Sequence, residues 1–186
     1  VALSANGEAT MAASSLDGGT ADNCGTVSLR AAFASNGGQE ISTFSPWVTF
    51  DCGMMGPTSV LLEATDETGV NRSRCLVSIT VIDLLPPTCV APPATELTCR
   101  VFADNLPVDI VDIFNDDPTG TSALLDANFG STVISDNCDS LAQRQILLGS
   151  LSACGTGRLV RRFVVNDGAG FTQDALCQQI IDVRPY

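Results

Sequence analysis

Residues 59–69 read Ser-Val-Leu-Leu-Glu-Ala-Thr-Asp-Glu-Thr-Gly, an apolar segment that runs into a polar turn. Residues 159–170, Leu-Val-Arg-Arg-Phe-Val-Val-Asn-Asp-Gly-Ala-Gly, have the same arrangement. Asp bonds to its own turn backbone and Gly tolerates positive φ, so Asp-x-x-Gly predicts a turn. After each turn a cysteine leads into alternating Ile and Val, the pattern of a half-buried strand. The repetition predicts two tandem β domains.

The composition restricts the class of protein. The 186 residues carry a net charge of −12, with nine Arg, no Lys, no His and eight Cys. This acidity argues against a nucleic-acid partner, which needs clustered basic residues. Eight cysteines in turn-rich segments favour disulfides and an extracellular location. A zinc site would need His or Cys-x-x-Cys pairs, and no apolar run is long enough for a membrane span.

The segment Asp83-Leu84-Leu85-Pro86-Pro87 predicts the domain boundary, because paired prolines form a stiff, extended linker. We therefore expect one domain at 1–83 and a second, more divergent one at 84–186. The chain begins without Met or a signal peptide. We expect Val1 to lie within a longer or processed polypeptide that carries further repeats on both sides.

Both halves share the order Asp-Asn-Cys, then Cys, then Asp-x-x-Gly, then Cys. Further distinctive pieces are residues 3–10 (Leu-Ser-Ala-Asn-Gly-Glu-Ala-Thr) and Phe50-Asp51-Cys52 in the first half, and Pro86-Pro87-Thr88-Cys89 and Cys154-Gly155-Thr156-Gly157 in the second. In combination they resemble the hyalin-repeat-like, immunoglobulin-like modules of large bacterial surface adhesins, especially those exported by the type IX route. The chain departs from these modules at two longer inserts, 36–47 and 109–130.

The resemblance implies an all-β fold of two tandem immunoglobulin-like β-sandwich domains with disulfide staples. Matching the two copies suggests the pairs Cys24–Cys52 and Cys138–Cys154, and the family pattern suggests Cys89–Cys177. Cys75 and Cys99 remain unassigned. A Cys75–Cys99 bond would use every cysteine, but it would have to cross the linker.

The expected function is structural and not enzymatic. Without His, the usual catalytic triads and imidazole proton shuttles are absent. A glycosidase needs two carboxyl groups, which Asp116 and Asp117 could supply. Asp is also a routine turn residue, however, and a solvated turn explains both residues.

No cofactor is expected, with calcium as an alternative. The calcium candidates are the acidic residues near the predicted domain ends: Asp22, Asp66, Asp83 and Asp136. None belongs to an Asp-x-Asp-x-Asp loop, and the turn alone explains Asp66. Phe44 and Trp47 in the first insert are candidate partner or sugar contacts, unless Trp47 covers the end of the core.

The sequence therefore predicts a structural repeat segment of an extracellular adhesin, stalk or filament on a bacterial surface. Its expected partners are neighbouring repeats and identical chains in a homo-oligomer or filament. The alternative is a carbohydrate- or protein-binding adhesin module that uses the inserts near Trp47 and Asp116 to bind a cell-surface glycan or protein.

Overall fold

The computed structural model describes residues 1–138, 141–152, 155–170, 172–173 and 177–185. It consists of two compact units, Val1–Leu85 and Pro86–Tyr186. The boundary lies next to Pro86-Pro87, close to the position expected from the paired prolines.

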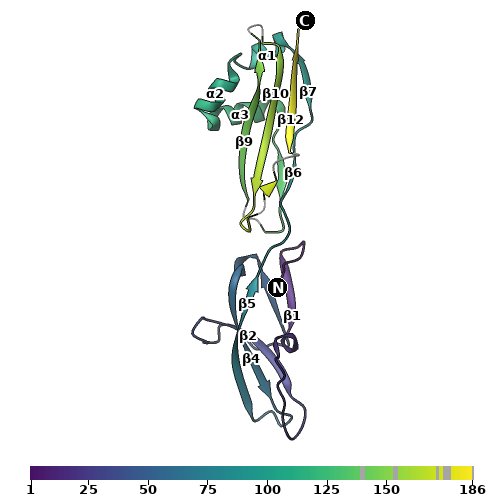
Figure 1. The fold of residues 1–186 in the computed structure, drawn as a ribbon, viewed down its shortest axis with the longest axis vertical. Coiled ribbons are helices and arrows are strands. Elements are labelled where there is room, and N and C mark those ends of the chain that lie inside the picture. Colours follow the sequence, from purple (N-terminus) through teal and green to yellow (C-terminus); the bar gives the residue numbers. More distant parts are fainter. Residues whose placement is uncertain (139–140, 153–154, 171, 174–176, 186) are drawn as a thin grey trace. The chain divides into compact units, whose positions relative to one another are not determined.

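The first unit contains two small antiparallel sheets (Figure 1). One pairs β1 with β3, and the other has the order β2-β4-β5. The elements are β1 (Glu8–Ala12), the 3₁₀ helix η1 (Ala13–Leu16), β2 (Ser28–Ala34), β3 (Trp47–Asp51), the 3₁₀ helix η2 (Cys52–Met54), β4 (Gly56–Thr65) and β5 (Arg72–Val81).

The core of the first unit lies between these two sheets. On β3, Val48 and Phe50 are buried while the alternate residues are exposed, as expected for a strand with one face in water. The Phe50 ring meets Phe33 of β2 edge to face, with ring centroids 5.5 Å apart. The first unit is therefore a two-sheet β-sandwich.

The predicted turn around Asp66 joins β4 to β5. These strands pair antiparallel from Gly56↔Val81 to Thr65↔Arg72. The Asp66 carboxylate accepts hydrogen bonds from the Thr68 hydroxyl and from the backbone and side-chain N–H groups of Asn71. Gly69 adopts φ +75°, which an L side chain rarely takes. This strand–turn–strand prediction is confirmed.

In its described residues, the second unit combines a five-stranded sheet, a two-stranded sheet and three helices. Strand β10 pairs with β9, β11 and β12, and β12 pairs with β7; β6 pairs with β8. The elements are β6 (Thr88–Val90), β7 (Thr95–Thr98), α1 (Cys99–Asn105), α2 (Ile110–Asp116), α3 (Pro118–Phe129), β8 (Val133–Ser135), β9 (Ala142–Leu151), β10 (Gly157–Asn166), β11 (Thr172–Gln173) and β12 (Gln178–Arg184).

The three helices pack on one face of the larger sheet (Figure 1). Phe102, Leu106, Ile110, Phe114 and Leu125 form one buried cluster with sheet residues that include Leu159 and Ile181. Much of the face that a second sheet covers in a plain sandwich is thus covered by helices. The predicted all-β, immunoglobulin-like fold class is confirmed, with a helical insert added to the second unit.

Two local expectations differ from the structure. The residues Glu96-Leu97-Thr98-Cys99-Arg100-Val101 predict a strand from their alternation, but β7 ends at Thr98 and α1 begins at Cys99. A solvated turn is expected at Asp116 and Asp117, but Asp116 ends α2 and Asp117 caps α3, where its carboxylate accepts the Gly120 N–H at 3.2 Å. Apolar residues spaced by three or four within one helix, such as Cys99 and Phe102 in α1 or Ile110 and Phe114 in α2, favour helices over the short alternating pattern.

Candidate functional site

Arg161 is the most deeply buried charged residue of the described second unit, with an exposed fraction of 0%. It lies on β10 between Leu159 and Phe163, which are also fully buried. Because alternate residues of a strand share a face, Arg161 must point into the layer between the sheet and the helices. Burial lowers the pKa of its guanidinium, while the neighbouring Asp126 opposes that shift.

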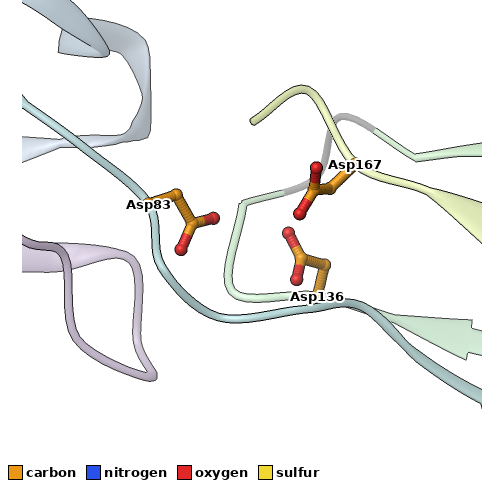
Figure 2. A group of neighbouring side chains, drawn as sticks. All are labelled: Asp83, Asp136 and Asp167. Carbon is orange, nitrogen blue, oxygen red and sulfur yellow. The ribbon is translucent and has the colours of Figure 1, made fainter. Parts of the chain in front are cut away.

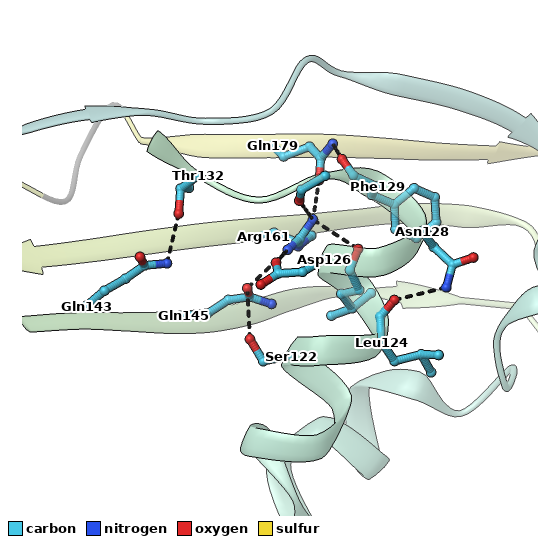
Figure 3. Close-up of polar contacts among 12 residues, drawn as sticks. Ser122, Leu124, Asp126, Asn128, Phe129, Thr132, Gln143, Gln145, Arg161 and Gln179 are labelled. Carbon is cyan, nitrogen blue, oxygen red and sulfur yellow. Dashed lines mark hydrogen bonds and ion pairs between the residues drawn. The ribbon is translucent and has the colours of Figure 1, made fainter. Parts of the chain in front are cut away.

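The guanidinium is held by side chains and carbonyls from several elements (Figure 3). Nη1 donates to Gln179 Oε1 at 2.7 Å and to Gly130 O at 3.0 Å. Nη2 donates to Gln145 Oε1 at 3.2 Å and forms an ion pair with Asp126 on α3. A cation–π contact places the Arg161 guanidinium carbon 5.1 Å from the Phe163 ring centre. These contacts connect β9, β10, β12 and the end of α3.

Gln179 extends this connection to the chain before β7. It is 1% exposed, and its Nε2 donates to Pro93 O at 2.8 Å and to Phe129 O at 2.9 Å. Arg161 and Gln179 together fix the position of the last turn of α3.

A groove of about 440 Å³ lies between the helices and strand β9. It is lined by Phe114, Pro118, Thr119, Ser122, Ala123, Asp126, Gln143, Arg144 and Gln145. The Asp126 side chain is 37% exposed, whereas its partner Arg161 is not exposed at all. Arg161 therefore lies beneath the groove, whereas its partner Asp126 forms part of the groove wall.

The sequence-predicted contact residues Trp47 and Phe44 have different surroundings. Trp47 is 58% exposed on β3, opposite Ala12 of β1, so it does not cover the core. Phe44 is partly buried, and the Arg74 guanidinium carbon lies 4.5 Å from its ring centre. Among the described residues no ring contact joins Phe44 to Trp47.

The predicted acidic residues belong to different local structures. Asp22 is exposed in the loop before β2. Asp66 holds its turn, and its hydrogen bond from Asn71 lowers its pKa. Asp83 belongs to the first unit, where it accepts the Leu85 N–H at 3.0 Å.

Asp136 and Asp167, both in the second unit, have carboxylate oxygens within 4.8 Å of each other (Figure 2). Asp136 accepts the Cys138 N–H at 3.1 Å. Calcium takes about six to eight oxygen ligands, so two carboxylates are not sufficient to define a site.

The disulfide Cys89–Cys177 is present, as the family pattern suggests, with a Cα–Cα distance of 5.8 Å. Cys52 and Cys138 are also disulfide-bonded. The predicted partner of Cys138, Cys154, lies outside the described residues. Cys75 is an exposed free cysteine and Cys99 a partly buried one.

The predicted Cys24–Cys52 bond is wrong, because Cys24 is an exposed free cysteine. Cys24 lies near the Asp66 end of β4, since a Cβ on its neighbour Gly25 would stand 2.6 Å from Glu67 Oε2. Cys52 instead precedes the opposite end of β4, at Gly56. Ten residues of strand separate these ends, a distance of about 30 Å, far beyond the reach of a disulfide.

Sequence reasoning missed the Arg161–Asp126–Gln179 group. A signal was present, since Arg161 interrupts the otherwise apolar buried face of Leu159, Phe163 and Val165. A charged residue at such a position requires a buried partner. The start of α3 was also marked, by Asp117 at the N-cap and Pro118 at the first position.

No known protein family and no curated protein matches the chain. Among solved structures, it is similar to the fibronectin(III)-like modules of Clostridium thermocellum CbhA, with a TM-score of 0.28 and 12% identity over 99% of this chain and 89% of that one. It is also similar to the cadherin fragment PcdhgB3 EC1-4, with a TM-score of 0.31 and 14% identity over 99% of this chain and 48% of that one.

A third similar structure is the endo-fucoidan hydrolase MfFcnA4 from glycoside hydrolase family 107, with a TM-score of 0.27 and 11% identity. The match covers 88% of this chain but 24% of the hydrolase. Similarity at this level does not support an inference about function. None of the described helices is long and apolar enough to cross a membrane.

Proposed function

We propose that this chain is a load-bearing segment of an extracellular adhesin, stalk or filament on a bacterial surface. The observation that carries the proposal is a parallel pairing between the beginning and the end of each unit. In the first unit, Ala2 forms a parallel bridge with Ile82. The Leu3 N–H donates to Ile82 O, and the Ile82 N–H donates to Val1 O, both at 2.9 Å.

The second unit has a longer version of the same pairing. Strand β7, near its beginning, pairs parallel with β12, near its end, from Ile181↔Thr95 to Arg184↔Thr98. The Arg184 guanidinium also forms an ion pair with Glu96 across these strands, at 2.6 Å.

This geometry resists a pulling force. When the two ends of a unit are drawn apart, parallel terminal strands are sheared along their length, so their hydrogen bonds bear the load together. Antiparallel neighbours pulled from one end would instead open one bond after another. A spacer or stalk must resist extension, and it therefore needs terminal strands whose hydrogen bonds bear the load together.

Further support for this setting comes from the Cys89–Cys177 disulfide, which suits an oxidising compartment. The resemblance to hyalin-repeat-like adhesin modules supports a bacterial surface and the type IX route. In this proposal the partners are neighbouring repeats of the same polypeptide, with lateral assembly alongside identical chains.

The experiment is single-molecule stretching between handles at the two ends of the full chain, with its cysteines reduced and alkylated, because an intact Cys89–Cys177 bond would carry the load past β7. We expect two separate unfolding events per molecule, each at a rupture force well above that of a helical reference domain pulled at the same rate. Extension without distinct events, or at the force of the helical reference, would contradict the proposal.

A second candidate is an adhesin module that binds a cell-surface glycan or protein through Trp47. It is favoured by the 58% exposure of this side chain, because Trp is usually largely buried. Adhesion of particles coated with the chain should then fall on Trp47→Ala and persist on Thr49→Ala, an exposed neighbour on the same strand. Equal adhesion of both variants would exclude this candidate.

A further inference from the structure

We propose that the groove between α2, α3 and β9 binds a neutral, hydroxyl-rich ligand, a short carbohydrate chain. A load-bearing segment needs no ligand, so this inference goes beyond the proposed function and does not depend on it. All residues involved belong to the second unit.

Asp126, which lines the groove, forms an ion pair with the buried Arg161. A buried ion pair gains little stability over a well-packed apolar pair, because both charges lose their hydration. Here Arg161 is fully buried, yet its partner Asp126 keeps 37% of its side chain exposed. Arg161 engages Asp126 Oδ1, which leaves Oδ2 as an acceptor with no protein donor among the described residues.

Hydrogen bonds hold Gln145, a polar residue that lines the groove, in a fixed orientation. Gln145 Oε1 accepts from Arg161 at 3.2 Å and from the Ser122 hydroxyl at 3.3 Å (Figure 3). The Gln145 Nε2 is buried and has no acceptor among the described residues, which is uncommon for a buried donor. These groups are held in place before any ligand arrives, and this reduces the entropic cost of binding.

The groove is lined by both polar and apolar side chains. Thr119 and Gln143 offer both donor and acceptor capacity, whereas Ser122 offers an acceptor and Gln145 a donor. Their natural counterpart is a ligand whose groups also donate and accept, as sugar hydroxyls do. Pro118 and Ala123, which are both exposed, supply apolar surface for the C–H face of a sugar ring.

Charge and size select among hydroxyl-rich ligands. The lining carries one acidic residue, Asp126, and one basic residue, Arg144, so it provides no concentrated charge for a phosphate or a polyanion. The Asp126 carboxylate would repel an acidic sugar placed against it. The volume of about 440 Å³ lies within the range of small-ligand sites.

The test uses the full oxidised chain and a panel of neutral oligosaccharides of glucose, mannose, galactose and xylose, followed by calorimetric titration of any that bind. We expect at least one neutral probe to bind. Asp126→Asn keeps an oxygen for Arg161 but removes the charge, and Thr119→Ala removes an exposed hydroxyl. Each should weaken binding by about tenfold, the effect of one lost hydrogen bond to a ligand.

The matched control is Asp112→Asn, an identical change on an exposed α2 residue that lines a different groove. Its affinity should equal that of the parent chain. Far-UV circular dichroism and thermal unfolding of each variant separate lost binding from lost folding, and Thr119→Ala serves as the second variant if Asp126→Asn does not fold.

Three results would overturn the assignment. One is the absence of binding by every neutral probe. Another is binding that survives both Asp126→Asn and Thr119→Ala unchanged. The last is that the chain binds uronic-acid oligosaccharides or peptides but binds no neutral glycan. None of these results bears on the stretching experiment, so the two proposals fail separately.

Discussion

Arg161 shows how one residue organises the second unit. Its guanidinium joins α3 to three strands through Asp126, Gln145 and Gln179. Removing one member of a buried ion pair commonly costs about 3–5 kcal/mol, because the remaining polar groups stay buried without partners. Gln179 Oε1 and Gly130 O would be among those groups.

We therefore expect Arg161→Met to lower the free energy of unfolding of the second unit by about 3–5 kcal/mol. Urea denaturation followed by circular dichroism measures the change. The control is Arg162→Met, at the next position on β10, where the side chain is exposed. A surface change of this kind should cost less than about 0.5 kcal/mol, and equal losses for the two variants would exclude a structural role for Arg161.

Asp66 leads to a prediction about acid. The hydrogen bonds donated by Asn71 and Thr68 lower its pKa in the folded chain. Its stabilising contribution is thus fully present above the pKa of Asp in the unfolded chain, about 3.9, and is lost as the pH falls through the folded pKa. Asp66→Asn should therefore destabilise the first unit more at pH 7 than at a pH below the pKa of the Asp66 carboxyl in the folded chain.

Denaturant unfolding of the parent chain and of Asp66→Asn at several pH values checks this dependence. Asp22→Asn, the same change in the exposed loop before β2, is the matched control for the removal of one surface carboxylate. A difference between parent and Asp66→Asn that stayed constant from neutral to acid pH would show that the charge of Asp66 is unimportant.

At the scale of elements, the sequence predicts strands better than helices. The β4–β5 and β10–β12 pairs are predicted because apolar alternation and Asp-x-x-Gly act locally. The helices were partly hidden, since α1 and α2 have seven residues each and α1 directly follows the alternating run of β7. Their stability comes from packing on the sheet, a tertiary effect that a short sequence window does not contain.

The candidate site was even less predictable. The groove depends on Thr119 and Gln143, which are distant in sequence and become neighbours only when α3 docks on β9. The failed Cys24–Cys52 pairing has the same origin, because matching two copies says nothing about which ends of β4 the cysteines approach. By contrast, Cys89–Cys177 followed from the family pattern and is formed.

The Cys89–Cys177 disulfide should be a major source of stability for the second unit. It closes a loop with a sequence separation of 88 residues, for which the chain-entropy relation gives about 4–5 kcal/mol. We expect the double variant Cys89→Ala/Cys177→Ala to lose stability on this scale in thermal or urea unfolding. Cys75→Ala, which removes an exposed free cysteine, is the control and should unfold like the parent chain.

At the scale of the whole chain, the same disulfide changes the path of an applied force. Tension that arrives along residues 86–88 passes covalently from Cys89 to Cys177 and leaves through β12. The segment between the two cysteines, which includes the helices and the groove, is therefore never stretched while the bond is intact. A binding groove in this segment would keep its shape under a load that unfolds the first unit.

This bypass predicts a redox-dependent length. A separation of 88 residues corresponds to about 300 Å of extended chain. Full unfolding by force should therefore give a contour length at least about 300 Å greater in a chain reduced before pulling than in the oxidised chain. Alkylation of the reduced cysteines prevents the bond from re-forming during repeated pulls. Equal contour lengths for the two forms would mean that the disulfide does not carry the load, and the second unit would then resist extension only through the shear of β7 against β12.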